Sequence, residues 1–261
     1  MHQLFLCKFK GREFLNISPA EKIAAKINQS KPENWSEFET YLRRDDPPRY
    51  NEYFAELLVE SVSADEKNFD SLAISSYRSK ILETSLYEEL EMLKIEDISF
   101  LESLLDIEFP KNVFDVKCLY CSGKSTKGII NFKKYTMLEE IHILDFNKGI
   151  KFEHYSNSIK HITLWYFNPT NRSIKILIDA FPNVEEILIH HTNVESLEGI
   201  ENLKNLQSIH IDYGRNLKFV GALNQCKNAK KITFNNCRKV EDFDKIDKVP
   251  ERIVENFRLP G

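Results

Sequence analysis

The chain has 261 residues, of which 42% are hydrophobic and 29% are charged, and its formal net charge is -4. This composition is that of an ordinary globular protein, and together with the absence of long basic runs it argues against a nucleic-acid partner. Every apolar run is far shorter than the ~18 residues that a membrane-spanning helix needs, so we expect no membrane partner.

The N-terminal region, residues 1–95, is predicted to be small and mainly helical. Apolar-rich runs at 4–9 and 14–17 enclose a glycine-containing turn, which indicates a β-hairpin. The stretch Ser18-Pro19-Ala20-Glu21 combines a capping serine, a first-turn proline and a glutamate that reaches back, so it predicts a helix to about residue 28. Further helical patterns cover about 35–42, 50–62 and 68–94.

From residue 113 onward, a triplet of the form apolar-x-x-apolar-x-apolar recurs six times. The triplets are Val113/Val116/Cys118, Leu138/Ile141/Ile143, Ile159/Ile162/Leu164, Val184/Ile187/Ile189, Leu206/Ile209/Ile211 and Ala229/Ile232/Phe234. One triplet means little at this hydrophobic content, but the regular spacing is informative. Successive starts lie 21 to 25 residues apart, within the range of about 20–29 residues for repeats that each contribute one short strand.

Over residues 113–243 this pattern resembles the leucine-rich-repeat family, in an isoleucine-rich style similar to divergent bacterial repeats. The best match runs from Val184 to Leu203. The family's asparagine or cysteine position is occupied by Cys121 and Cys237, whereas four other repeats depart from it. The departing residues are Phe146, Phe167, Thr192 and Gly214. The resemblance implies an α/β leucine-rich-repeat solenoid with a curved parallel sheet over 96–261, including a C-terminal cap.

The alternation of the strands and this resemblance together define a candidate partner-binding surface on the concave face. Its residues are Tyr120, His142, Leu144, Asp145, Trp165, Tyr166, Leu188, His190, His191, His210, Asp212 and Tyr213. Exposed aromatic and leucine side chains surrounded by polar groups are typical of protein interfaces. The alternative is that the N-terminal helices fold back and cover this face. Trp165 is the best candidate for a central anchor.

Two residue pairs raise the question of a metal site, and we expect none. His190 and Asp212 are predicted cross-strand neighbours, and imidazole with carboxylate can bind zinc. Consecutive strand residues point to opposite sides, so His190 and His191 are not expected to converge, and a polar interface cluster is favoured. Cys118-x-x-Cys121 is half of a zinc-knuckle pattern without a second pair at ligand spacing, and buried thiols are favoured.

The expected function is protein binding without catalysis and without a cofactor. The sequence lacks the motifs of nucleophilic hydrolases, phosphate-binding loops, zinc proteases and dinucleotide-binding folds. Five scattered cysteines and a start unlike a secretory signal favour a cytoplasmic location. A narrower hypothesis is a bacterial immunity protein that neutralises a toxin domain. The alternatives are an adaptor or regulatory repeat protein and, less favoured, an enzyme.

Overall fold

The computed structural model describes residues 2–9, 12–19, 58–61, 68–74, 84–100, 105–121, 127–144, 146 and 150–255. The chain forms two compact units. The first unit comprises Met1–Ile130 and Lys134–Leu138, and the second comprises Asn131–Lys133 and Glu139–Gly261. Among the described residues most neighbouring strands are parallel and helices are few, which is an α/β class of fold. The predicted division between residues 95 and 96 stays a prediction.

The first unit is a sheet with the strand order β6-β5-β4-β2-β1-β3. The strands are β1 (His2–Phe9), β2 (Arg12–Pro19), β3 (Leu58–Ser61), β4 (Asn68–Ile74), β5 (Lys94–Phe100) and β6 (Cys118–Cys121). Strand β1 pairs antiparallel with β2 and β3, whereas β2, β4, β5 and β6 pair in parallel. The helix α3 (Thr84–Glu91), the 3-10 helix η4 (Lys111–Phe114) and the strand β7 (Gly128–Asn131) complete the described elements that begin in this unit.

The predicted hairpin is confirmed by the β1–β2 pair, but most of the predicted helices that can be compared are wrong. Ser18 and Pro19 do not start a helix, because they end β2 opposite Gln3 and His2. The helical patterns at about 50–62 and 68–94 overlap strands β3 and β4, and only α3 retains part of the second one. Short apolar runs do not distinguish a strand from a helix, and here pairing with a neighbouring strand decides. The predicted helical pattern at 35–42 lies outside the described residues.

The apolar triplet begins earlier in the chain than the sequence pattern suggested. Strands β4 and β5 carry it as Phe69-x-x-Leu72-x-Ile74 and Ile95-x-x-Ile98-x-Phe100. Leu72 pairs with Ile98 and Ile98 with Leu119, and all three side chains are fully buried. The triplet at β6 is therefore Val116/Leu119/Cys121, three residues later than predicted. With this correction, successive triplets from Phe69 to Ala229 start 21 to 26 residues apart.

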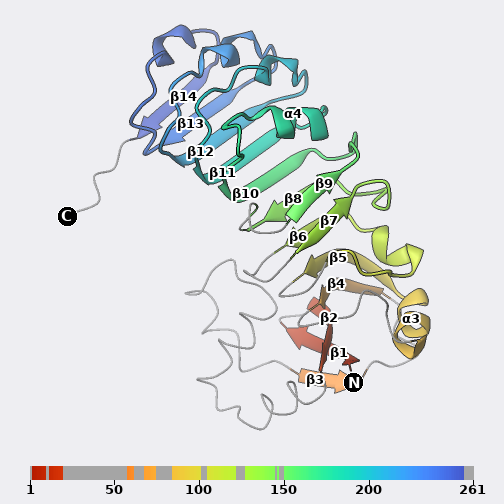
Figure 1. Cartoon of the computed structure of the whole chain (residues 1–261). Helices are drawn as coiled ribbons and strands as arrows, with labels where there is room; N and C mark the ends of the chain where they lie inside the picture. The colour runs from red at the N-terminus through yellow and green to blue at the C-terminus, as the bar shows by residue number, and fades with distance from the viewer. Residues whose placement is uncertain are drawn as a thin grey trace, which may run out of the picture. The chain divides into compact units, whose positions relative to one another are not determined.

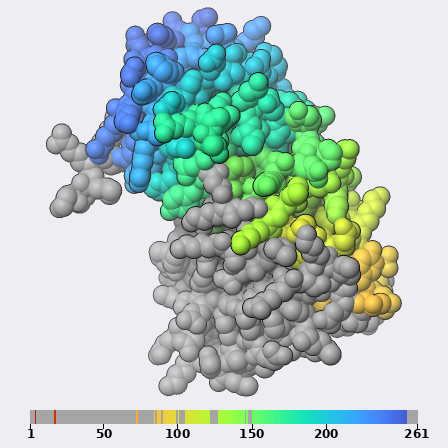
Figure 2. All heavy atoms as spheres, in the orientation of Figure 1, coloured from red at the N-terminus to blue at the C-terminus, as the bar shows by residue number. Residues whose placement is uncertain are grey.

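The second unit is a sheet of six parallel strands in the order β14-β13-β12-β11-β10-β8. The strands are β8 (Glu140–Ile143), β10 (His161–Phe167), β11 (Glu186–Thr192), β12 (Ser208–Gly214), β13 (Lys231–Asn235) and β14 (Glu251–Glu255). They follow one another from green to blue in Figure 1, and Figure 2 draws the same residues as spheres. The short strand β9 (Ile150–Glu153) lies between β8 and β10 in the chain. Strand β14 was not predicted, since its residues were assigned to a cap.

The predicted register of this sheet is confirmed by a column of five isoleucines. Each member pairs with the next across the sheet, and none is more than 2% exposed. The column consists of Ile141, Ile162, Ile187, Ile209 and Ile232. Because side chains alternate along a strand, burying this column on one face directs the flanking residues to the other face.

Short helices and turns connect the strands and enclose the buried side chains. The connecting elements are α4 (Lys175–Ala180), η6 (Ile200–Asn202), η7 (Gly221–Gln225) and η8 (Phe243–Lys245). Phenylalanine rings pack edge to face in the core, as in Phe146 with Phe167 at 5.2 Å between ring centroids. The hydroxyl of Thr192 donates to the carbonyl of Phe167 at 2.6 Å, which links β11 to the end of β10. The Cys237 thiol contacts the Ile211 carbonyl of the preceding strand β12 at 3.4 Å.

Candidate partner-binding surface

The face of the second unit's sheet opposite the isoleucine column carries three rows of side chains across the strands. The first row consists of His142, Thr163, Leu188, His210 and Thr233, which pair in this order from β8 to β13. Its members are half-buried except Thr233, which is buried. His142, Leu188 and His210 were predicted for this face, because the alternation around the buried isoleucines fixes which positions face outward.

The second row consists of Trp165, His190, Asp212 and Asn235, again as direct cross-strand partners. Trp165 is 37% exposed, and its ring centroid lies 4.4 Å from that of His190. The predicted neighbours His190 and Asp212 are confirmed, with Nδ1 of His190 2.7 Å from a carboxylate oxygen of Asp212. A large aromatic side chain therefore packs directly against a polar cluster on an exposed sheet face.

The third row consists of Tyr166, His191, Tyr213 and Asn236, and all four residues have a left-handed backbone with φ between 54° and 59°. The rings of Tyr166 and His191 stack at 5.0 Å, and those of His191 and Tyr213 stack at 4.5 Å. Non-glycine residues rarely adopt this conformation, so its recurrence at four strand ends is a property of this fold rather than of one residue.

This backbone conformation corrects one prediction about the histidines. We expected consecutive residues to point to opposite sides, so that His190 and His191 would not share a surface. The left-handed residue interrupts the alternation, and the following residues, Phe167 and Thr192, are the ones that turn inward and are buried. As a result Trp165 and Tyr166 are both exposed, with ring centroids 6.5 Å apart, and His190 and His191 are both half-buried on this face.

Asp212 is the polar centre of the surface. One carboxylate oxygen lies 2.7 Å from Nδ1 of His190, and the other lies 2.9 Å from Nε2 of His210. A carboxylate only accepts hydrogen bonds, so each of these ring nitrogens carries the hydrogen and donates it. The Asp212 side chain is 14% exposed, and it forms no ion pair with a lysine or arginine of the described residues.

Burial favours the neutral forms of His190 and His191. It lowers the pKa of His190, and the neighbouring His210 adds to this effect while Asp212 opposes it. Burial also lowers the pKa of His191, and Arg215, beyond the end of β12, acts in the same direction. A neutral imidazole that donates through one nitrogen presents the other nitrogen as an acceptor. For His190 the acceptor is Nε2.

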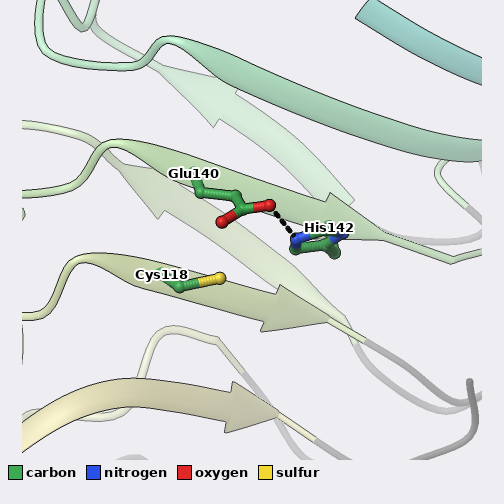
Figure 3. Close-up of side chains that lie close together, drawn as sticks. All are labelled: Cys118, Glu140 and His142. Carbon is green, nitrogen blue, oxygen red and sulfur yellow. Dashed lines mark hydrogen bonds and ion pairs between the residues drawn. The ribbon is translucent and has the colours of Figure 1, made fainter.

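A further row of polar side chains lies at the strand starts, and the sequence analysis did not single it out. Glu140 accepts a hydrogen bond from Nε2 of His142 at 2.7 Å, as Figure 3 shows on β8. This hydrogen bond lowers the pKa of Glu140, although burial opposes it. On the next two strands, His161 contacts Glu186 at 3.2 Å. Their position, one residue before each buried isoleucine, was the available signal.

Three predicted surface residues differ from the rest. Tyr120 lies on β6 of the first unit, where it follows the buried Leu119 and is half-buried. Leu144 follows β8 and is half-buried, and Asp145 lies outside the described residues. The other nine lie on the exposed face of the second unit's sheet. They are His142, Trp165, Tyr166, Leu188, His190, His191, His210, Asp212 and Tyr213.

Four of the five cysteines are core residues. Cys118, which Figure 3 draws on β6, is buried, as are Cys121, Cys226 and Cys237, and none of the four forms a disulfide with another described residue. Burial raises the pKa of the Cys121 thiol well above its ordinary value. The predicted burial of Cys118 and Cys121 is confirmed.

No protein-family model matches the chain, and no curated protein matches it either. Among the described residues, no helix is both long enough and apolar enough to cross a membrane. The geometry of the surface is therefore the observation that bears on function.

Proposed function

We propose that the second unit is a divergent leucine-rich-repeat array that binds another protein through the exposed face of its sheet, without catalysis. The repeat assignment is supported by the triplet that recurs with each parallel strand and by the isoleucine column. It is also supported by Thr192 and Cys237, which contact the carbonyl of a residue one strand back. Stacked repeats bury a continuous core and leave one face of the sheet for a partner.

The observation that carries the binding proposal is the exposure of Trp165 and Tyr166, at 37% and 45%, on an ordered face. Their rings contact His190 and His191, and His191 also stacks on Tyr213. Aromatic side chains held by their neighbours lose little conformational entropy when a partner covers them, which makes them effective anchors. The polar residues beside them supply orientation and specificity.

In its narrower form, the proposal is an immunity protein that occludes a toxin domain in the bacterial cytoplasm. The buried thiols suit a reducing compartment, and stoichiometric occlusion requires a specific surface rather than catalytic groups. A toxin gene beside the gene for this chain, together with rescue of toxin-expressing cells by the chain, would support this form. Binding to a partner whose toxicity is unaffected would favour an adaptor instead.

The test of the general proposal compares two exposed aromatic residues of the second unit. A partner is captured and identified by mass spectrometry, purified, and its affinity is then measured for Trp165→Ala and for the control Phe219→Ala. Phe219 is 49% exposed but lies outside the three rows, in a bridge with Ser196. Trp165→Ala should weaken binding by more than ~2 kcal/mol, about thirtyfold, with little change in melting temperature.

The control variant should bind like the wild type. Equal affinities of all three proteins for the purified partner would exclude the centre of this face as the binding site. A lower melting temperature for Trp165→Ala, without an effect specific to binding, would indicate that another part of the chain covers this face.

A further inference from the structure

The centre of the surface combines a carboxylate without a permanent counter-ion, aromatic rings and imidazole acceptors. Asp212 is held by two imidazoles, and its side chain is largely shielded from water. Taking a carboxylate out of water is costly unless a cation or strong hydrogen bonds compensate for it. Two imidazole N–H groups supply hydrogen bonds, and burial favours the neutral form of His190. The Asp212 carboxylate therefore lies in a partly dehydrated place without a lysine or arginine partner among the described residues.

Carboxylates outnumber ammonium groups around this centre. At outward positions of strands β8 and β10–β13, the carboxylates are Glu140, Glu186 and Asp212, and the only ammonium group is that of Lys231. Lys231 lies 2.8 Å from Glu251 of β14 and is thereby compensated. Arg215 stands beyond the end of β12 and acts on His191, but it forms no ion pair with Asp212.

We propose that the partner places an arginine side chain over Asp212, between Trp165 and Tyr213. This inference rests on the proposed function and names the chemistry of the partner at its centre. A guanidinium group fits because it donates several hydrogen bonds in one plane and stacks on aromatic rings. The Asp212 carboxylate supplies the opposite charge, Nε2 of His190 supplies a further acceptor, and Trp165 supplies the aromatic neighbour.

The side chain expected at this position is arginine rather than lysine. An ammonium group is a compact, strongly hydrated charge, whereas a guanidinium group is weakly hydrated and tolerates a largely apolar aromatic surrounding. The acceptors here lie on two neighbouring strands, about 4.8 Å apart. One planar, forked donor can reach both acceptors, and a single ammonium group is less suited to do so.

The test uses two small probes on the complete chain. L-Argininamide and L-citrullinamide, which has the same shape but an uncharged ureido side chain, are titrated separately at pH 7.5, and amide and indole signals are followed by NMR. We expect saturable shifts of the Trp165 indole and of β11–β12 amides with argininamide, and at least tenfold weaker binding of citrullinamide. Asp212→Asn should weaken argininamide binding at least tenfold. The control Glu186→Gln, on the same face, should change it less than twofold.

Equal binding of the two probes to the wild-type protein would overturn the proposal, and this outcome does not depend on any variant folding correctly. So would argininamide binding that Asp212→Asn leaves unchanged. If the probes fail while Trp165→Ala still weakens binding of the purified partner, the face binds protein through other chemistry and only the arginine inference is lost. If Trp165→Ala has no effect on that partner but argininamide binds at Asp212, the proposed function is the part that fails.

Discussion

Thr192 shows how one side chain joins two neighbouring strands. It is buried, its hydroxyl donates to the Phe167 carbonyl, and it accepts from the amide of Val194 at 3.2 Å. Thr192→Val keeps the shape but leaves these backbone groups without their partner, so we expect a loss of about 1–3 kcal/mol in the free energy of unfolding. Urea denaturation measures this loss. Thr192→Ser keeps the hydroxyl and should retain most of the stability, and equal losses in both variants would contradict the explanation.

The pKa values of His190 and His191 determine how the free energy of unfolding is expected to change with pH. Their pKa values are lowered in the folded protein from an ordinary value of about 6.5. The unfolded chain therefore binds more protons below about pH 6.5, and stability falls as the pH decreases from there. Glu140, whose pKa is also lowered, adds a further loss below its ordinary range, near pH 4.5. The titratable groups that act on His190 are Asp212 and His210 on β12 and His191 on its own strand.

The pH prediction is checked by melting temperatures at pH 7.5 and 5.5. His190→Asn keeps a donor toward Asp212 but does not titrate, so its melting temperature should fall less between these two values than that of the wild type. An identical fall in both proteins would show that His190 does not contribute. This measurement requires no partner.

At the scale of the strand, the alternation of buried and outward-facing side chains determines which substitutions are tolerated. Ile187 and Leu188 are consecutive on β11, but Ile187 is 2% exposed in the isoleucine column while Leu188 is half-buried on the opposite face. Ile187→Asp buries an unpaired charge and should cost several kcal/mol, enough to unfold the unit. Leu188→Asp should cost about 1 kcal/mol or less. Circular dichroism and melting of both variants check this, and a folded Ile187→Asp protein would refute the register.

The same alternation explains what the sequence could predict. Because every second residue of these strands is buried, the sequence pattern was sufficient to predict the register from β8 to β13 and the neighbours His190 and Asp212. It failed where local pattern is ambiguous: β3 and β4 are short, and their apolar residues also fit helical spacing. The left-handed positions carry tyrosine, histidine or asparagine instead of glycine, so no residue type signalled that the alternation would break there.

At the scale of the whole chain, the reactivity of the buried cysteine thiols tests whether the cores of both units are formed. Burial raises the pKa of Cys226 and of Cys237 to about 11 and that of Cys121 further, so few of these groups are thiolates in the folded protein. Because the thiolate is the reactive form, iodoacetamide at pH 8 should modify these three at least tenfold more slowly in the native protein than in urea. Peptide mapping by mass spectrometry measures each site separately. Rapid labelling of native Cys121 would contradict its position in the core of the first unit.

The left-handed strand ends have a consequence for how this surface can diversify. A non-glycine residue pays about 1–2 kcal/mol to adopt that conformation, and β-branched residues tolerate it least. Only a limited set of amino acids is therefore expected at the four left-handed positions, Tyr166, His191, Tyr213 and Asn236. A library randomised at these four codons and selected for folding should be depleted in valine, isoleucine and threonine. Glycine would relieve the strain but would remove the side chain that contacts a partner. Homologous chains that bind different partners should therefore differ at this row mainly by exchanging aromatic and amide side chains.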